Sequence, residues 1–160
     1  MPNAAAPHRR HQIRLNDSAR PLSAFSTLWK GPCPPTCSQN TELAKAVALL
    51  LSPPSDRLLL VTGPGGKLVG TLTWGDLYED LFLTLVPPRI SPAPGAHRPK
   101  RTIRARDLMS DAVSVQPSTP LDEALRLLYR NKLKGLPVVD RRGRPVGYLR
   151  LAAIQSWLRP

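Results

Sequence analysis

Apolar residues in the last third of the chain fall into short groups whose spacing predicts a strand followed by a helix. Residues 112–115 carry the β-branched bias of a short strand. Apolar residues then recur at helical spacing, which predicts a helix capped by Ser118 or Thr119 and ended by Gly135. One face of this helix gathers Leu121, Ala124, Leu125, Leu127 and Leu128.

The remainder of this segment predicts two more strands and a closing helix. Compact apolar runs at 136–139 and 145–149 flank residues 140–143, which are typical of a tight turn. Residues 151–158 predict a last helix with its apolar positions on one side. The predicted order is therefore strand, helix, strand, turn, strand, helix.

The first half of the chain repeats this order, so the sequence contains an internal duplication. The elements that correspond to those of the second half are a strand at 58–61, a turn at 63–66, a strand at 69–72 and a helix at 76–82. Neither half, at roughly 55 residues, buries enough apolar surface to be stable alone, so we expect the two halves to pack together. The first-half helix lies 78 residues before its counterpart in the second half. The apolar residues that match at this offset are Leu43, Ala46, Val47, Leu49 and Leu50.

These elements carry motifs that closely resemble a CBS domain, the family named after cystathionine β-synthase. The second half shows Asp107-Leu-Met-Ser110, Leu136-Pro-Val-Val-Asp140 and Gly147-Tyr-Leu149, and the first half is similar through residues 60–61 and 66–76. The resemblance implies a tandem CBS pair, or Bateman module, with an α+β fold. Each repeat would be a βαββα unit, the two being related by pseudo-twofold symmetry, with small mixed sheets flanked by helices.

Charge and proline content divide the chain into four segments. The net charge is +12, and much of it lies outside the predicted repeats. Residues 1–22 predict a basic, flexible tail, and residues 87–106 predict a proline-rich and then basic linker. The two repeats would then occupy residues 23–86 and 107–160.

Composition and motifs disfavour several classes of protein. The apolar runs are far shorter than the ~20 residues that a membrane-spanning helix needs, and no secretory signal is visible, so we expect a cytoplasmic protein with no membrane contact. Cys33 and Cys37 are expected to be thiols, and we expect no metal site because the histidines lie in segments predicted to be flexible. No nucleophile–base pair, paired carboxylates or P-loop is visible, which predicts no catalytic residues and no enzyme activity.

The family resemblance implies an adenosine site at the pattern Gly-x-x-Thr/Ser-x-x-Asp, which the segment from Gly70 to Asp76 fills. A carboxylate at a helix N-terminus can accept hydrogen bonds from both ribose hydroxyls, and a threonine hydroxyl can bond the sugar–phosphate side. Thr73 and Asp76 are therefore the predicted ligand contacts, with Thr71 and Gly75 as near neighbours. The competing interpretation is that Thr73 is an ordinary strand residue and Asp76 a helix cap.

The second repeat departs from this pattern, because Arg150 stands where the threonine belongs and Ala153 where the aspartate belongs. The sequence therefore predicts one working nucleotide site at most. Similarity to the γ subunit of AMP-activated protein kinase, over residues 130–139, implies that Lys134 contacts phosphate. The alternative is that Lys134 belongs to the solvated end of a helix.

The sequence thus predicts a regulatory module that requires no cofactor and binds an adenosine-containing molecule: AMP, ATP, S-adenosylmethionine or a dinucleotide. An unidentified effector protein would respond to it. Two alternatives are a nucleic-acid-associated protein that uses the tail and linker arginines, and a degenerate repeat pair that serves only as a scaffold. The resemblance also implies a homodimer, with an interface of Leu77, Leu81, Phe82, Ile154, Trp157 and Leu158.

Overall fold

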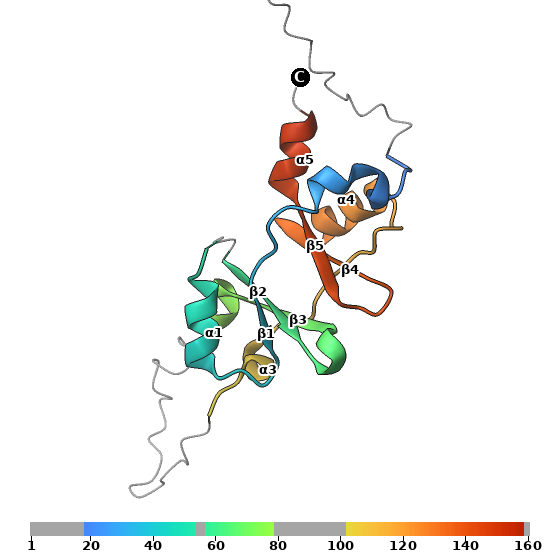
Figure 1. Ribbon diagram of the computed structural model, residues 1–160. Helices are drawn as coiled ribbons and strands as arrows, with labels where there is room; N and C mark the ends of the chain where they lie inside the picture. Colours follow the sequence, from blue (N-terminus) through green and yellow to red (C-terminus); the bar gives the residue numbers. More distant parts are fainter. Residues whose placement is uncertain (1–17, 54–56, 79–101, 159–160) are drawn as a thin grey trace, which may run out of the picture.

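The first half of the protein folds into a three-stranded mixed sheet with helices against it. The computed structural model describes residues 18–53, 57–78 and 102–158 (Figure 1). Strand β1 runs parallel to β2, and β2 pairs antiparallel with β3, in the order β1-β2-β3. Residues 74–78 continue from β3 as helix. The elements of this half are η2 (Leu22–Leu28), β1 (Thr36–Ser38), α1 (Leu43–Leu50), β2 (Leu58–Thr62), η3 (Pro64–Gly66) and β3 (Leu68–Thr73).

The second half repeats this arrangement around an antiparallel pair of strands. Val115 makes an isolated parallel bridge to Val138, in the place that Cys37 of β1 holds opposite Val61 of β2. The strand predicted at 112–115 is thus reduced to one bridge, while the duplicated α+β order is confirmed. The elements are α3 (Ala105–Leu108), α4 (Leu121–Arg130), β4 (Gly135–Val139), β5 (Pro145–Arg150) and α5 (Leu151–Leu158).

Both predicted ends of helix α4 were wrong. Neither Ser118 nor Thr119 caps it: Pro120 occupies the cap position, and the Thr119 hydroxyl instead accepts a hydrogen bond from the Gln116 N–H at 3.0 Å. The helix ends at Arg130, and Gly135 opens β4 instead of ending the helix. A Cβ at Gly135 would lie 2.6 Å from Cζ of Tyr148, so glycine is needed there to let the tyrosine ring lie against the strand.

The two halves exchange their leading segments. Helix η2 and Trp29 pack into the core of the second half, whereas α3 packs into the core of the first (Figure 1). The second-half core contains Leu22, Phe25, Leu28, Trp29, Val115, Leu121, Ala124, Leu128, Leu136, Val138, Leu149 and Ile154. The first-half core contains Cys37, Ala46, Leu50, Leu59, Val61, Leu72, Leu77 and Ala105.

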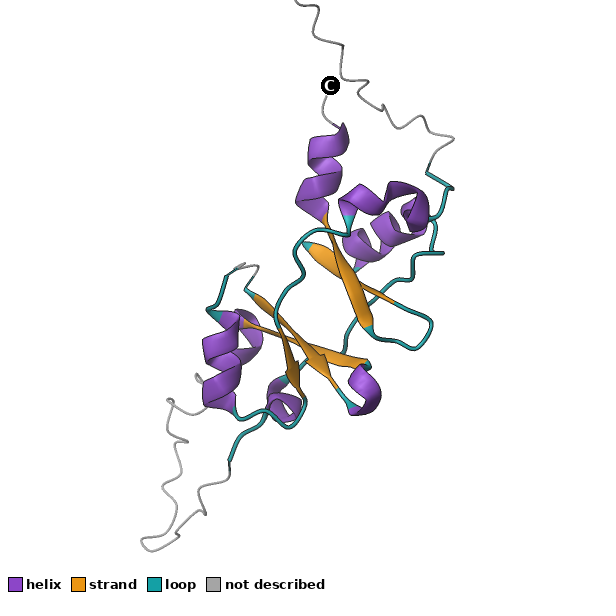
Figure 2. Cartoon of the chain, viewed as in Figure 1, coloured by secondary structure: helices purple, strands orange, loops and turns teal. Residues whose placement is uncertain are grey.

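Backbone hydrogen bonds hold each exchanged segment to the sheet that receives it. Thr71 and Ser110 exchange both N–H···O bonds at 2.9 Å, and the Tyr148 N–H donates to the Trp29 carbonyl at 2.9 Å. Figure 2 shows the result: the two sheets lie toward the middle of the molecule and the main helices lie on its outer sides. Each sheet therefore has one face on a core and the other toward the opposite half, so even Leu60, outside both cores, is fully buried.

The ends of the predicted tail and linker take part in this exchange. Leu22 is fully buried, and so is Ala105. Residues 1–17 of the tail and 87–101 of the linker lie outside the described residues, as do residues 79–82 of the helix predicted at 76–82. The four segment boundaries stay predictions. Within the part of the chain that the structure describes, no helix combines the length and apolarity needed to cross a bilayer.

Two equivalent glycines make the exchange sterically feasible. A Cβ at Gly70 would lie 2.9 Å from the Ser110 carbonyl, and one at Gly147 would lie 2.6 Å from the Trp29 carbonyl. In each case the obstacle is backbone, which cannot rotate away as the end of a side chain can. The Val-Gly pair at the same place in both repeats is thus explained by the close approach of the exchanged segments.

Gly147→Ala is expected to lower the free energy of unfolding by about 1–3 kcal/mol, the usual cost of overpacking a core. Gly31→Ala is the matched control, because a Cβ there has nothing within 4 Å. Chemical denaturation of both variants measures the difference. Equal stability of the two would contradict the close contact between Gly147 and Trp29.

Candidate functional site

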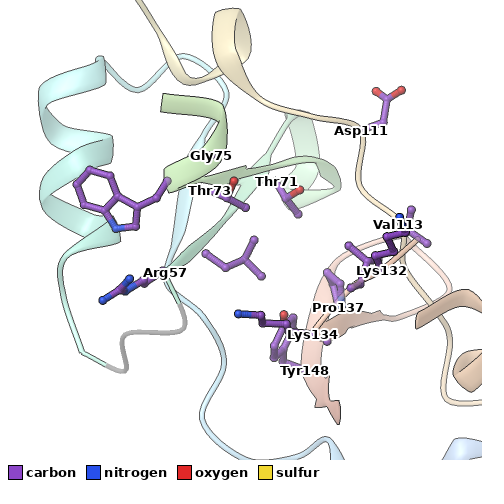
Figure 3. Close-up of a pocket in the computed structure, with 14 residues that line it drawn as sticks. Arg57, Thr71, Thr73, Gly75, Asp111, Val113, Lys132, Lys134, Pro137 and Tyr148 are labelled. Atoms are coloured by element: carbon purple, nitrogen blue, oxygen red, sulfur yellow. The ribbon is translucent and has the colours of Figure 1, made fainter. Parts of the chain in front are cut away.

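A cavity of about 370 Å³ lies between the two halves (Figure 3). This volume falls in the range of small-molecule sites. Strand β3, the start of the helix after it and residues 57–58 line one side. Strand β4, the loop before it, Tyr148 of β5 and the segment leading to Val115 line the other. A ligand in this cavity would therefore contact both repeats at once.

The structure brings four of the five predicted site residues together. Thr71, Thr73, Gly75 and Lys134 all line the cavity, the first three from the first half and the last from the second. Sequence motifs in two distant parts of the chain thus converge on one place. Their role as ligand contacts stays a prediction.

Asp76, the fifth predicted residue, does not line the cavity, and its carboxylate is already hydrogen-bonded within the protein. Oδ2 accepts hydrogen bonds from both the backbone N–H and the hydroxyl of Thr73, each at 2.6 Å. Oδ1 accepts a hydrogen bond from the Ser110 hydroxyl, also at 2.6 Å. The helix that follows Thr73 is thereby capped, as the competing interpretation of Asp76 predicted. For Asp76 to bind a ribose diol, the Ser110 bond at least would have to be exchanged.

Two further cations at the cavity, Arg57 and Lys132, were missed by the motif search. Arg57 immediately precedes β2, as Lys134 immediately precedes β4, so the two are equivalent positions of the duplication. The helix offset of 78 would have led from Lys134 to position 56; the strand registers, which pair Leu58 with Thr73 and Gly135 with Arg150, are what make Arg57 its equivalent. Lys132 stands in the loop between α4 and β4, inside the stretch 130–139 that resembles the kinase γ subunit, but that similarity assigned a phosphate contact to Lys134 alone.

Arg150, which replaces the motif threonine in the second half, is held by contacts within the protein. Its guanidinium donates to the Pro32 carbonyl at 2.7 Å and lies 5.2 Å from the centre of the Tyr148 ring. Ala153 packs partly buried against the second-half core. An arginine and an alanine therefore stand where the first half has Thr73 and Asp76, and no carboxylate is available there for a ribose.

The two cysteines differ in their surroundings. Cys37 is buried in β1, where it packs like Val115 of the other half, and Cys33 is exposed; both are free thiols. Partial desolvation raises the pKa of Cys33 although nearby Arg150 opposes the rise, and burial raises the pKa of Cys37 against a hydrogen bond with Thr41. Among the described residues no group of three or more His, Cys, Asp or Glu side chains could hold a metal.

Alkylation at pH 8 should therefore modify Cys33 alone in the folded protein, and more slowly than free cysteine, because the raised pKa leaves less thiolate. Cys37 should react only after unfolding. Iodoacetamide labelling followed by peptide mass spectrometry measures the alkylation rate of each cysteine. Equal labelling of the two thiols in the folded protein would contradict the buried position of Cys37.

The apolar residues predicted to form a dimer interface are partly core residues, so that prediction was wrong for Leu77 and Ile154. These side chains are 3% and 1% exposed because their helices turn this face onto their own sheets. Trp157 packs edge-on against Phe25, with ring centres 5.3 Å apart. Leu81, Phe82 and the side chain of Leu158 lie outside the described part of the structure.

Comparisons with known proteins agree with the duplicated fold. The model of the CBS domain family matches residues 105–159. No curated protein matches the chain. Among solved structures, a CBS domain-containing protein from Thermotoga maritima is 28% identical, with a TM-score of 0.65 over 86% of this chain and 92% of that one.

Two other similar structures were solved with adenosine compounds bound. The CBS domain pair of protein MJ0100, in complex with 5′-methylthioadenosine and S-adenosyl-L-methionine, is 20% identical, with a TM-score of 0.63 over 84% of this chain and 98% of that one. CBSX2 in complex with AMP is 24% identical, with a TM-score of 0.61 over 86% of this chain and 94% of that one.

The duplicated α+β fold with a cavity between its halves defines this chain as a two-repeat module of the kind seen in those structures. Residues 105–159 match the CBS domain family, and the chain as a whole has the fold of a tandem CBS domain pair. The resemblance noted from the sequence is confirmed.

Proposed function

We propose that this chain is a regulatory module that binds an adenosine-containing ligand in the cavity between its two CBS domains. The observation that carries the proposal is the convergence of Thr71, Thr73, Gly75 and Lys134 on one cavity of ligand size. The adenosine compounds bound by MJ0100 and CBSX2 support the choice of ligand class.

The polar groups of the cavity suit the parts of such a ligand. Thr71 and Thr73 present hydroxyl-bearing side chains along β3, and Asp76 stands one helical turn further on. In the bound complex the ribose hydroxyls would take the place of Ser110 as donors to Asp76. Apolar residues such as Val113, Leu133 and Pro137 complete the wall and can cover a flat base.

Regulation follows from the position of the cavity. A ligand that contacts both halves favours whichever relative packing of the halves fits it best, and it shifts the population toward that packing. The hydrogen bond between Ser110 and Asp76 links the segment after α3, which leads into the second half, to the helix after β3, so its exchange on binding would carry the signal between the halves. We also propose that the protein has no catalytic activity, forms a homodimer, is cytoplasmic and acts on a separate effector protein.

Calorimetric titration of the full chain with AMP, ATP, S-adenosylmethionine and NAD tests this function. We expect at least one to bind below millimolar concentration with one site per chain. Thr71→Val should weaken that binding, since it removes a cavity hydroxyl while keeping the side-chain shape. Thr36→Val, at an exposed position on β1, is the control. Absence of binding by all four compounds would overturn the proposal.

The nucleic-acid alternative depends on charges in the tail and linker, which lie mostly outside the described residues. No observation of the described part favours it over the cavity. The scaffold alternative would be supported if every titration were negative.

A further inference from the structure

The charged side chains that line the cavity are predominantly basic. Arg57, Lys132 and Lys134 contribute three positive charges, and Asp111 contributes one negative charge. None of the three cations forms an ion pair with another residue that the structure describes. Cations gathered in a partly enclosed cleft focus the potential there and favour an anionic ligand.

Backbone conformation gives a second, independent observation at the same place. Arg57 and Lys132 have φ of 53° and 52°, and no other residue except glycine has positive φ within the described ranges. This conformation costs roughly 1–2 kcal/mol for a residue with a Cβ, and glycine would relieve it. Strain of this kind concentrates at functional sites, and here both instances bring a cation to the cavity wall.

The cations also come from both repeats. Arg57 precedes β2 and Lys134 precedes β4, so equivalent positions of the two halves contribute to one cavity, with Lys132 beside Lys134 in sequence (Figure 3). A single phosphate needs one or two such partners. A chain of two or three phosphates offers enough negative charge to engage cations from both halves, and charge-assisted hydrogen bonds of this type are the strong ones.

We infer that the ligand is a nucleoside polyphosphate, with at least two phosphates held by Arg57, Lys132 and Lys134, and not an uncharged nucleoside or a sulfonium compound. This inference rests on the proposed function and narrows it. The sulfonium of S-adenosylmethionine would add a positive charge to a cavity that already carries an excess of them. A polyphosphate neutralises that excess and contacts both CBS domains through the phosphates as well as through the nucleoside.

Calorimetric titration of the full chain with adenosine, AMP, ADP, ATP and S-adenosylmethionine provides the test. ADP and ATP should bind at least tenfold more tightly than adenosine and S-adenosylmethionine. This difference in affinity should shrink as salt is raised from about 50 to about 500 mM, because salt screens the attraction between the phosphates and the cations. Adenosine or S-adenosylmethionine binding as tightly as ATP would overturn the inference while leaving the proposed function intact.

Substitutions assign the phosphate contacts. Arg57→Gln and Lys134→Gln should each weaken ATP binding about tenfold, the usual size of one charge-assisted contact, and change adenosine binding less than about twofold. Lys45→Gln, at an exposed position on α1 away from the cavity, should change neither. Both cavity residues are exposed, so the variants should melt like the parent, which a thermal scan verifies. Equal losses for ATP and adenosine would overturn the assignment.

GTP separates this inference from the proposed function. Binding of GTP as tight as that of ATP would support polyphosphate recognition and overturn the adenosine part of the proposal. Failure of every nucleotide to bind would overturn both.

Discussion

Trp29→Ala is expected to lower the free energy of unfolding by about 3–5 kcal/mol, the usual cost of truncating a buried tryptophan. Trp29 is 5% exposed and belongs to the core of the second half, although it lies in the first third of the sequence. Its indole Nε1–H donates to the Leu22 carbonyl at 2.8 Å, which ties helix η2 together. The Trp29 carbonyl accepts a hydrogen bond from the Tyr148 N–H, so loss of the ring also weakens the attachment of β5 to this segment.

The location of the damage is the sharper test of the exchanged segments. Amide hydrogen exchange of Trp29→Ala should accelerate in β4 and β5 more than in β2, because the indole packs only into the second-half core. Trp74→Ala is the matched control: this tryptophan is half-buried at the cavity and packs against the first-half core. Faster exchange in β2 than in β4 after Trp29→Ala would contradict the exchanged arrangement.

Asp76→Ala and Ser110→Ala are expected to change ligand affinity in opposite directions. Asp76→Ala removes the proposed acceptor of the ribose hydroxyls and should weaken binding tenfold or more, since hydrogen bonds to a charged group contribute about 1.5–3 kcal/mol. Ser110→Ala removes the hydroxyl that now bonds Oδ1 of Asp76. The ligand then has no internal hydrogen bond to displace there, so affinity should rise about two- to tenfold.

Asp76→Ala has a structural side effect that has to be separated from its effect on binding. Asp76→Ala also deletes the cap of the helix after Thr73, at a cost of about 1 kcal/mol to stability. Asp76→Asn retains an oxygen for that cap but lacks the charge, so it should restore stability more than it restores affinity. Weaker binding in Ser110→Ala, of the same size as in Asp76→Ala, would show that the Ser110 bond supports the site and does not compete with the ligand.

The duplicated order of elements could be predicted because each repeat carries its own periodic apolar pattern. Thr71, Thr73 and Lys134 were found because they sit in short motifs whose neighbours are close in sequence. The exchange of η2 and α3 could not be found in this way, since contacts between residues such as Trp29 and Gly147 leave no periodic signal.

Helical periodicity also misled the prediction of the dimer interface. An apolar face on a helix predicts burial, but it does not say whether the face meets its own sheet or a second molecule. Leu77 and Ile154 turned out to meet their own sheets. Arg57 was missed for a different reason: it belongs to no motif, and only its equivalence to Lys134 in the duplication marks it.

Methyl NMR during titration with ATP locates the ligand most directly. Methyl groups of Leu58, Thr71 and Val113 line the cavity and should shift in one-to-one stoichiometry, whereas the core methyls of Leu59 and Leu149 should stay nearly unchanged. Shifts confined to the surroundings of Arg150, or saturation at two ligands per chain, would contradict a single site between the two CBS domains.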